Sequence, residues 1–278
     1  MAPSSVTSKQ RSLKRAVYCS GVGVHTGAPC QIRLEPAPVH SGRFFLSPQG
    51  DKLAAQVQHL CGSAYQTVLG SDTFQVQTPE HLLAAAFLLD IDNLAIHIDG
   101  PEVPILDGSA LPWVQLMRSA GIVEQSATAA YAPIKRQELR EGQSSILIVP
   151  SSALSLTVSI DFNHPDIGAQ SAHFKPESLL HQLAPAQTFG FKADLPKLQA
   201  MGLARGANLK NTLVYDYERL INPHKKRFSQ EALHHKALDI LGDLSLLNQR
   251  IHAHITAHRP SHALNQAWLK RQELIQET

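Results

Sequence analysis

The sequence predicts an α+β fold with two domains. Strand-like segments followed by helix-like segments occur twice along the chain, which favours this class over a doubly wound parallel sheet. The chain has 278 residues, enough for two domains with their own buried cores. Hydrophobic residues make up 43% and charged residues 17% of the chain, a composition typical of folded globular proteins.

The first half begins with strands and continues with helices. The segments VYCSGVGVHTG and CQIRLEP alternate apolar and polar residues, as strands do, and short extended segments continue to about Val68. We expect a helix after Thr78, with Thr78 as its N-cap and Pro79 at the first helical position. The remaining expected elements of this half are the buried helix body over 82–89, a strand over 93–99 and a second helix over 107–120.

The second half repeats this order after a change in composition. The segment EQSATAAYA, residues 124–132, is small and polar, and we interpret it as a linker. The predicted domains are therefore residues 1–126 and residues 127–278. The expected elements of the second half are strands over 145–150, 154–162 and 251–257, and helices over 229–247 and 261–275.

Charge and cysteine content narrow the class of protein. The formal net charge is +2 with no long Lys/Arg run, so we expect no nucleic-acid partner. The longest apolar run, residues 82–89, is far shorter than the roughly 18 residues of a membrane span. The N-terminus is polar and lacks the apolar stretch of a secretory signal. We interpret it as a short frayed tail, and a fragment of an organellar targeting peptide is the alternative. Three cysteines without a close pair fit a reducing compartment, and we expect a cytoplasmic protein.

The segment HHKALDILGD, residues 234–243, is the strongest candidate for a metal site. His235 and Asp239 are spaced i, i+4, and Asp243 follows one turn later, so a helix places all three on one face. A polar helix face with an ion pair from Lys236 is the alternative interpretation. The residues between them are apolar, and a buried face with one histidine and two aspartates needs a compensating cation.

Other histidines and a glycine-rich turn are weaker candidates. Glu80 and His81 lie at the start of the first predicted helix. Glu80 is either a catalytic base or a carboxylate stabilised by the helix dipole, and His81 is either a metal ligand or a solvated side chain. His262 opens the last helix and reads as a general acid or a surface residue. His252 and His254 form a competing ligand pair, which we interpret as packing or surface residues. GVGVHTG lacks the lysine of a phosphate-binding loop and reads as a tight turn between strands.

Taken together, these segments resemble one family, the UDP-3-O-acyl-N-acetylglucosamine deacetylases of lipid A biosynthesis. The resemblance extends from Ser20 to about Asn265. The segments that carry it are SGVGVHTG, TPEHLLAAAF, GPEVPILDGSA, IDFNHP, AQTFGF, GLARGAN, HHKALDILGDL and SHALN. It implies two α+β domains, each with a helix layer packed on a β-sheet, and an active site between them.

The resemblance also implies a metal-dependent mechanism. Zn²⁺ is the implied ion, and Fe²⁺ is an alternative at a site with two histidines and one aspartate. The implied ligands are His81, His235 and Asp239. The implied catalytic residues are Glu80 as general base, His262 as general acid, Thr188 as oxyanion donor and Asp243 as the carboxylate that supports the catalytic histidine.

The implied substrate contacts lie in the second half. Asp161 and Phe162 resemble uridine contacts, Phe189 lies in the substrate pocket, and Lys236 and Arg259 occupy positions associated with the diphosphate. Residues 191–214 resemble an inserted element that walls a passage for the acyl chain.

The expected function is hydrolysis of the N-acetyl group of UDP-3-O-acyl-N-acetylglucosamine, with release of acetate, by a monomeric enzyme. The alternative is a non-catalytic relative that binds sugar nucleotides. Retention of every metal and proton-transfer residue favours the enzyme.

Overall fold

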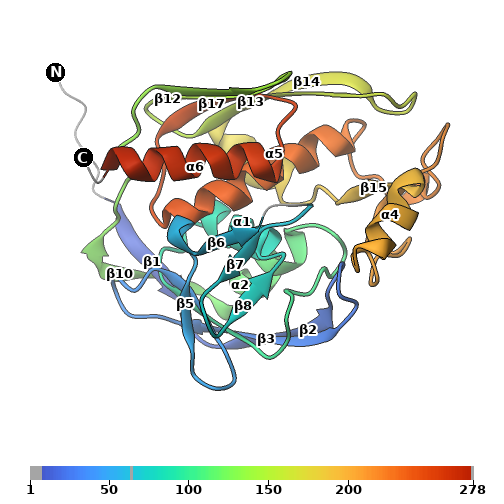
Figure 1. Ribbon diagram of the computed structural model, residues 1–278. Helices are drawn as coiled ribbons and strands as arrows, with labels where there is room; N and C mark the ends of the chain where they lie inside the picture. The colour runs from blue at the N-terminus through green and yellow to red at the C-terminus, as the bar shows by residue number, and fades with distance from the viewer. Residues whose placement is uncertain (1–7, 63–64, 277–278) are drawn as a thin grey trace.

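The computed structural model describes residues 8–62 and 65–276, without the side chains of 273–276. The N-terminal tail that the sequence predicts as frayed falls mostly in residues 1–7, outside the described residues. Figure 1 shows helices in the middle of the molecule, with sheets above and below them. Mixed helices and sheets confirm the predicted α+β class. None of the helices in residues 8–62 and 65–276 has the length and hydrophobicity of a membrane-spanning segment.

Two five-stranded sheets with the same strand order form the outer layers. In each, the last strand in sequence lies at the centre and pairs in parallel with one neighbour, and the other pairings are antiparallel. The first sheet has the order β2 (Val17–Val22), β3 (Pro29–Pro36), β9 (Leu94–Ile98), β4 (Arg43–Leu46), β5 (Lys52–Ala54). The second has the order β11 (Gln137–Glu141), β12 (Ser144–Pro150), β17 (Ala253–His258), β13 (Ser155–Phe162), β14 (Gly168–Phe174). The two halves are therefore structural repeats, although no repeat is visible in the sequence.

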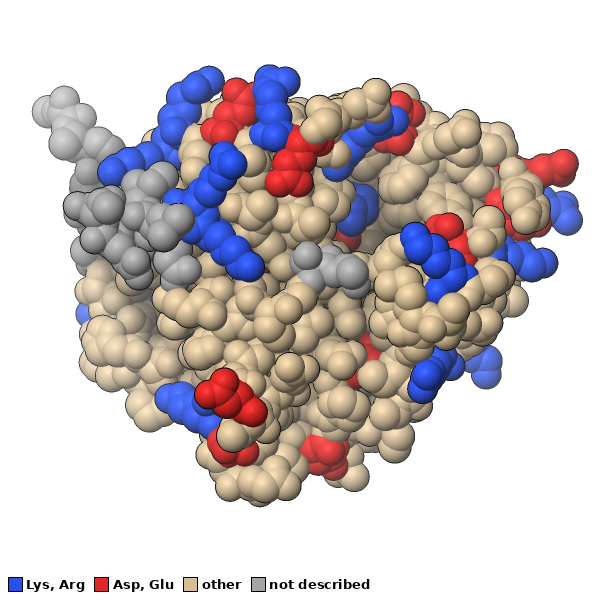
Figure 2. All heavy atoms as spheres, in the orientation of Figure 1, with Lys and Arg blue, Asp and Glu red and all other residues tan. Residues whose placement is uncertain are grey.

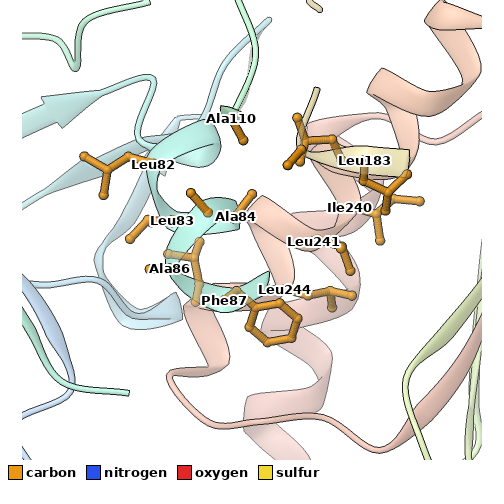
Figure 3. Packing of buried hydrophobic residues seen from close by; sticks show 14 of the residues in the cluster. Leu82, Leu83, Ala84, Ala86, Phe87, Ala110, Leu183, Ile240, Leu241 and Leu244 are labelled. Atoms are coloured by element: carbon orange, nitrogen blue, oxygen red, sulfur yellow. The ribbon is translucent and has the colours of Figure 1, made fainter. Parts of the chain in front are cut away.

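The helices follow the same repeat. In each half, one helix precedes the central strand and another follows it. These helices are α1 (Glu80–Leu88) and α2 (Leu111–Ala120) in the first half, and α5 (Glu231–Leu244) and α6 (His262–Gln276) in the second. One continuous hydrophobic cluster includes residues of both halves, because α1 and α5 pack against each other. Figure 3 shows this contact, with Ala84 and Phe87 of α1 beside Leu241 and Leu244 of α5.

A glycine allows the two central helices to approach closely. A Cβ atom added to Gly242 of α5 would lie 2.6 Å from the carbonyl oxygen of Glu80 in α1, closer than real contacts allow. The first turn of α1 therefore rests directly on the backbone of α5. This contact brings the Glu80-His81 pair of α1 to the helix that carries His235 and Asp239.

Each half carries an insertion between its fourth strand and its central helix. In the first half it is a sheet of β6 (Leu60–Gly62), β7 (Val68–Gly70) and β8 (Gln75–Gln77). In the second half α3 (Leu179–Leu183) leads to β15 (Phe189–Phe191), α4 (Leu195–Ala200) and β16 (Leu213–Tyr215), and β15 pairs in parallel with β16. The segment predicted as an inserted element thus forms a small β-α-β unit. Figures 1 and 2 show α4 on a lobe at one side, and basic and acidic side chains intermingled on the face drawn.

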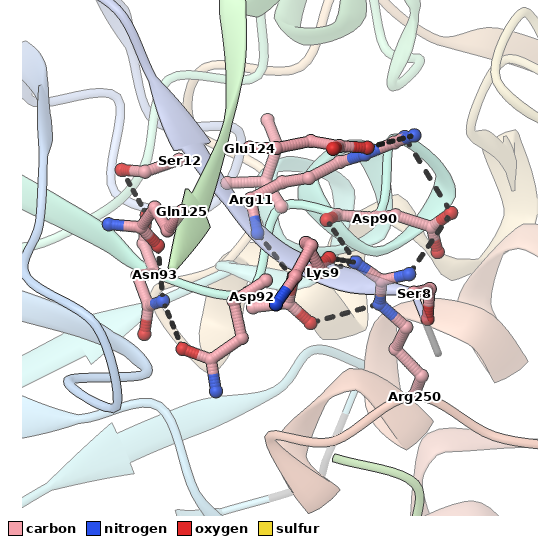
Figure 4. Close-up of polar contacts among 12 residues, drawn as sticks. Ser8, Lys9, Arg11, Ser12, Asp90, Asp92, Asn93, Glu124, Gln125 and Arg250 are labelled. Carbon is pink, nitrogen blue, oxygen red and sulfur yellow. Dashed lines mark hydrogen bonds and ion pairs between the residues drawn. The ribbon is translucent and has the colours of Figure 1, made fainter. Parts of the chain in front are cut away.

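Polar contacts join the two halves at the other end of α1. Arg250, which precedes β17, donates to both carboxylate oxygens of Asp92 at 3.0 and 2.8 Å and to the carbonyl oxygen of Lys9 at 2.9 Å. Arg11 contacts Asp90 and Glu124 in the same cluster (Figure 4). These contacts tie the first and last parts of the chain together.

The linker interpretation of residues 124–132 is wrong for most of the segment. Residues Ile122–Thr128 form β10, which pairs antiparallel with β1 (Lys9–Leu13). Its side chains are exposed or half-buried, and pairing with β1 satisfies its backbone hydrogen bonds. Position 126 falls within this strand, and the division into residues 1–126 and 127–278 remains a proposal based on the structural repeat.

Two helix starts also differ from expectation. The helix expected from residue 107 begins at Leu111, because Asp107 accepts hydrogen bonds from the backbone and hydroxyl of Ser109 and forms a turn before the helix. Thr78 is not the N-cap of α1, because the helix begins at Glu80 and Pro79 occupies the cap position. It has a φ of 53°, and its hydroxyl donates to Gln66 and Glu102 at 2.7 and 2.9 Å.

Candidate active site

Three side chains from the two central helices form a group that can hold a metal ion. His81 is the second residue of α1, and His235 and Asp239 lie one turn apart on α5. One ligand atom from each lies within 4.8 Å of the other two, and all three residues are buried. Among the described residues this is the one such group found, and it is the set that the family resemblance implies.

The surroundings of these ligands suit a divalent cation. The Nδ1 atom of His235 lies 3.1 Å from the carbonyl oxygen of Ala186, so donation from Nδ1 leaves Nε2 free to bind a metal. Burial, assisted by the nearby His235, lowers the pKa of His81 to about 3, and burial also lowers the pKa of His235. Burial opposes ionisation of Asp239, but Lys236 and the histidines outweigh it and lower the pKa of that carboxyl. The group therefore offers two neutral imidazoles and one carboxylate.

Glu80 and His262 lie beside this group. The Nε2 atom of His262 is 3.8 Å from a carboxylate oxygen of Glu80 and 3.9 Å from one of Asp239. Burial raises the pKa of Glu80 to about 8, although His262 acts in the opposite direction. His262 thus lies between the predicted general base and a predicted metal ligand.

A buried carboxylate orients the His262 ring. The Nδ1 atom of His262 lies 2.9 Å from Asp243, which has no exposed surface. Burial alone would lower the pKa of His262, but the Asp243 carboxylate outweighs it and raises that pKa to about 9. The Asp243 carboxylate therefore favours the positively charged form of His262, whose Nε2 atom lies near Glu80 and Asp239.

Residues 186–189 line the same site. Ala186 contacts His235 through its carbonyl, and the ring centroid of Phe189 is 6.2 Å from that of His235. Between them, the half-buried Thr188 is fixed by its backbone, which donates to Gly108 at 2.7 Å and accepts from Leu213 at 2.9 Å. The predicted oxyanion residue therefore lies on a segment held against the metal group.

The predicted nucleotide contacts extend away from the metal group. The ring of Phe162 is 5.5 Å from that of Phe189, so these aromatic rings lead from His235 toward the end of β13. There, Arg259 donates to Asp161 at 2.8 Å and also to Gln143. In contrast, Lys236 donates to Asp239 at 2.7 Å and so lies beside the metal group. Both predicted diphosphate contacts thus pair with carboxylates in this structure.

Sequence comparisons agree with this geometry. Residues 10–273 match the family model described as UDP-3-O-acyl N-acetylglycosamine deacetylase. The chain belongs to this family. Similar curated proteins are named UDP-3-O-acyl-N-acetylglucosamine deacetylase. They include proteins from Myxococcus xanthus (38% identical, covering 98% of this chain and 88% of the relative), Helicobacter pylori (39%, covering 94% and 90%) and Acidithiobacillus ferrooxidans (38%, covering 97% and 91%).

Membership in the deacetylase family confirms the predicted resemblance, and the family is metal-dependent. The competing histidines lie elsewhere, as expected. His254 contacts the hydroxyl of Ser155 at 2.8 Å on the second sheet, and the ring of His252 packs against Tyr131.

Three polar residues near Asp243 were not predicted from the sequence. They are Thr67, Asn265 and Gln266. Asn265 and Gln266 follow His262 by three and four residues. This spacing could have predicted that they lie beside His262, because such positions share a helix face. Thr67 had no such signal, since it lies 176 residues from Asp243 in sequence.

Proposed function

We propose that this protein is a zinc-dependent hydrolase that removes the N-acetyl group of UDP-3-O-acyl-N-acetylglucosamine and releases acetate, in lipid A biosynthesis. The observation that carries the proposal is the meeting of the buried His81, His235 and Asp239 with Glu80 and His262. Family membership and the names of the relatives support the choice of substrate. The three cysteines are free thiols, which supports a cytoplasmic location.

The donor set fits zinc. Two neutral imidazoles and one carboxylate are ordinary ligands for Zn²⁺, and three protein ligands leave a position for water or substrate. Fe²⁺ is the alternative that the same donors accept. When bound, the ion would polarise the amide carbonyl and lower the pKa of a coordinated water.

Two residues beside the metal group would each carry out one proton transfer. Glu80 is placed to accept a proton from the attacking water, and the dipole of α1 favours its carboxylate form. His262, held charged by Asp243, would donate a proton to the leaving amine, which is a poor leaving group until protonated. The Thr188 hydroxyl would donate to the oxygen that becomes negative.

The rest of the substrate would extend along the aromatic rings toward β13. Phe162 would stack on the uracil, Asp161 would contact the uridine, and Phe189 would line the pocket between the uridine and the metal group. Arg259 and Lys236 would bind the diphosphate by exchanging their present carboxylate partners for phosphate oxygens. The unit formed by residues 191–214 would wall the acyl chain.

Loss of a ligand should reduce metal content and activity together. In Asp239→Ala, one of three protein ligands is missing, and we expect metal affinity to fall by at least roughly 10- to 100-fold, the range seen when even supporting residues are lost. Metal analysis of purified protein and acetate release would be measured on the same samples. His254→Ala is the control and should keep its metal. Full occupancy in Asp239→Ala, or metal loss in His254→Ala, would show that the ligand set is wrong.

Arg259→Ala should raise KM for the UDP-sugar about 10-fold or more and change kcat little. A charge-assisted hydrogen bond is worth about 1.5–3 kcal/mol, and a diphosphate contact forms equally in the ground and transition states. Steady-state kinetics would measure both constants. Arg140→Ala is the matched control, because Arg140 pairs with Glu138 on β11 and should not affect KM. An unchanged KM in Arg259→Ala would exclude this residue from substrate binding.

A further inference from the structure

Thr67 is a buried residue that the proposed mechanism does not use. It precedes β7 in the insertion of the first half and is 1% exposed. Its backbone is held within the insertion, because its carbonyl oxygen accepts a hydrogen bond from the backbone N–H of Thr78 at 2.9 Å. The small sheet thus places a threonine from outside both central helices in the active site.

The Thr67 side chain completes the hydrogen bonds of Asp243. Its hydroxyl donates to Oδ1 of Asp243 at 2.6 Å and accepts from Nε2 of Gln266 at 3.0 Å. The same hydroxyl oxygen lies 3.4 Å from Nδ1 of His262, a longer contact. The other oxygen of Asp243, Oδ2, accepts from His262 and from Asn265, each at 2.9 Å. Thr67 is the donor found for Oδ1 among the described residues, so its loss leaves one oxygen of a fully buried carboxylate without this partner.

The Thr67 backbone also reaches the other proton-transfer residue. Its N–H donates to Oε2 of Glu80 at 3.4 Å, a long hydrogen bond. One residue therefore contacts both Glu80 and the carboxylate that orients His262. Substitution of Thr67 by a residue without a hydroxyl removes the hydroxyl bond to Asp243, whereas the backbone N–H bond to Glu80 remains available.

We propose that Thr67 is a positioning residue for the deacetylation, whose hydroxyl fixes Asp243 and through it the ring of His262. The inference rests on the proposed function. Because both oxygens of Asp243 are held, the carboxylate cannot rotate, and the Nε2 atom of His262 stays between Glu80 and Asp239. Displacement of a catalytic group by about 1 Å can reduce a rate by as much as roughly 100-fold.

The test compares two substitutions at this position. Thr67→Val keeps the branched shape and removes the hydroxyl, and kcat should fall about 10- to 100-fold with KM and metal content unchanged. Thr67→Ser keeps the hydroxyl and should restore most of kcat. A normal kcat in Thr67→Val, a fall in Thr67→Ser as large as in Thr67→Val, or an effect on KM alone would overturn the proposal.

A matched control separates positioning from general stability. Ser12 is equally buried, and its hydroxyl also makes one donated and one accepted hydrogen bond, to Asn93 at 2.8 Å and from Ala37 at 3.0 Å. Ser12→Ala should lower the melting temperature as Thr67→Val does and leave kcat unchanged. If kcat falls equally in both variants, Thr67 acts through stability and the proposal fails.

A measurement without substrate distinguishes this inference from the proposed function. Proton NMR should show a downfield signal for the Nδ1–H of His262, assigned by its loss in His262→Gln. The signal should persist in Thr67→Ser and disappear or broaden in Thr67→Val, or in Thr67→Ala if the valine variant does not fold. An identical signal in the hydroxyl-free variant overturns the positioning role. Absence of acetate release by the unmodified protein would instead overturn the proposed function.

Discussion

Replacement of Glu80 by alanine should reduce kcat roughly 10²- to 10⁴-fold, the usual contribution of a general base. The variant should retain its metal, because Glu80 is not among the three ligand residues. The loss should appear in kcat and kcat/KM alike, since proton transfer contributes only in the transition state. Steady-state kinetics and metal analysis on the same preparation would measure these quantities.

Glu80→Gln is the control variant that keeps the shape of the Glu80 side chain. It can still accept the backbone hydrogen bond from Thr67, but it cannot accept the proton of a water molecule. We therefore expect Glu80→Gln to be about as slow as Glu80→Ala. Substantial activity in Glu80→Gln would contradict the assignment of Glu80 as base.

The pH dependence of kcat/KM should be bell-shaped, and the basic limb should belong to His262. The enzyme needs Glu80 deprotonated and His262 protonated, so activity rises as Glu80 loses its proton and falls as His262 loses its own. Burial raises the pKa of Glu80 to about 8, and the Asp243 carboxylate outweighs burial and raises the pKa of His262 to about 9. A divalent cation beside both groups would lower both pKa values, so the acidic limb should lie below pH 8 and the basic limb below about pH 9. His262→Ala should lose roughly 10²- to 10⁴-fold in rate and lack this basic limb.

Asp243→Asn tests the origin of the basic limb. Asp243 outweighs the effect of burial and raises the pKa of His262, so removal of its charge should move the limb to lower pH. A limb that stays in place in Asp243→Asn and persists in His262→Ala would belong to another group. His262 would then not be the general acid.

Much of this fold could be predicted from local sequence patterns. The buried run 82–89 and the segment HHKALDILGD predict the two central helices, and the strand patterns predict both central strands. The metal group was predictable because two of its members share a helix face, but His81 joined it only through the family resemblance. Spacing alone left His252 and His254 as competitors.

The remaining features depend on contacts between distant segments. The polar segment around residue 126 forms β10 because β1, more than 100 residues earlier, supplies its partner. Thr78 forms hydrogen bonds with Glu102 and Gln66 rather than with its own helix, because its left-handed backbone turns the side chain toward them. Thr67 reaches Asp243 through a small insertion. In each case the deciding hydrogen bond joins segments that no local pattern relates.

The most direct test of the account is acetate release from UDP-3-O-acyl-N-acetylglucosamine by protein of known metal content. The account predicts one Zn²⁺ per chain, loss of acetate release when a chelator removes the metal, and recovery when Zn²⁺ is returned. Undiminished turnover by metal-free protein, or no acetate release by protein with one equivalent of Zn²⁺ or Fe²⁺, would contradict it.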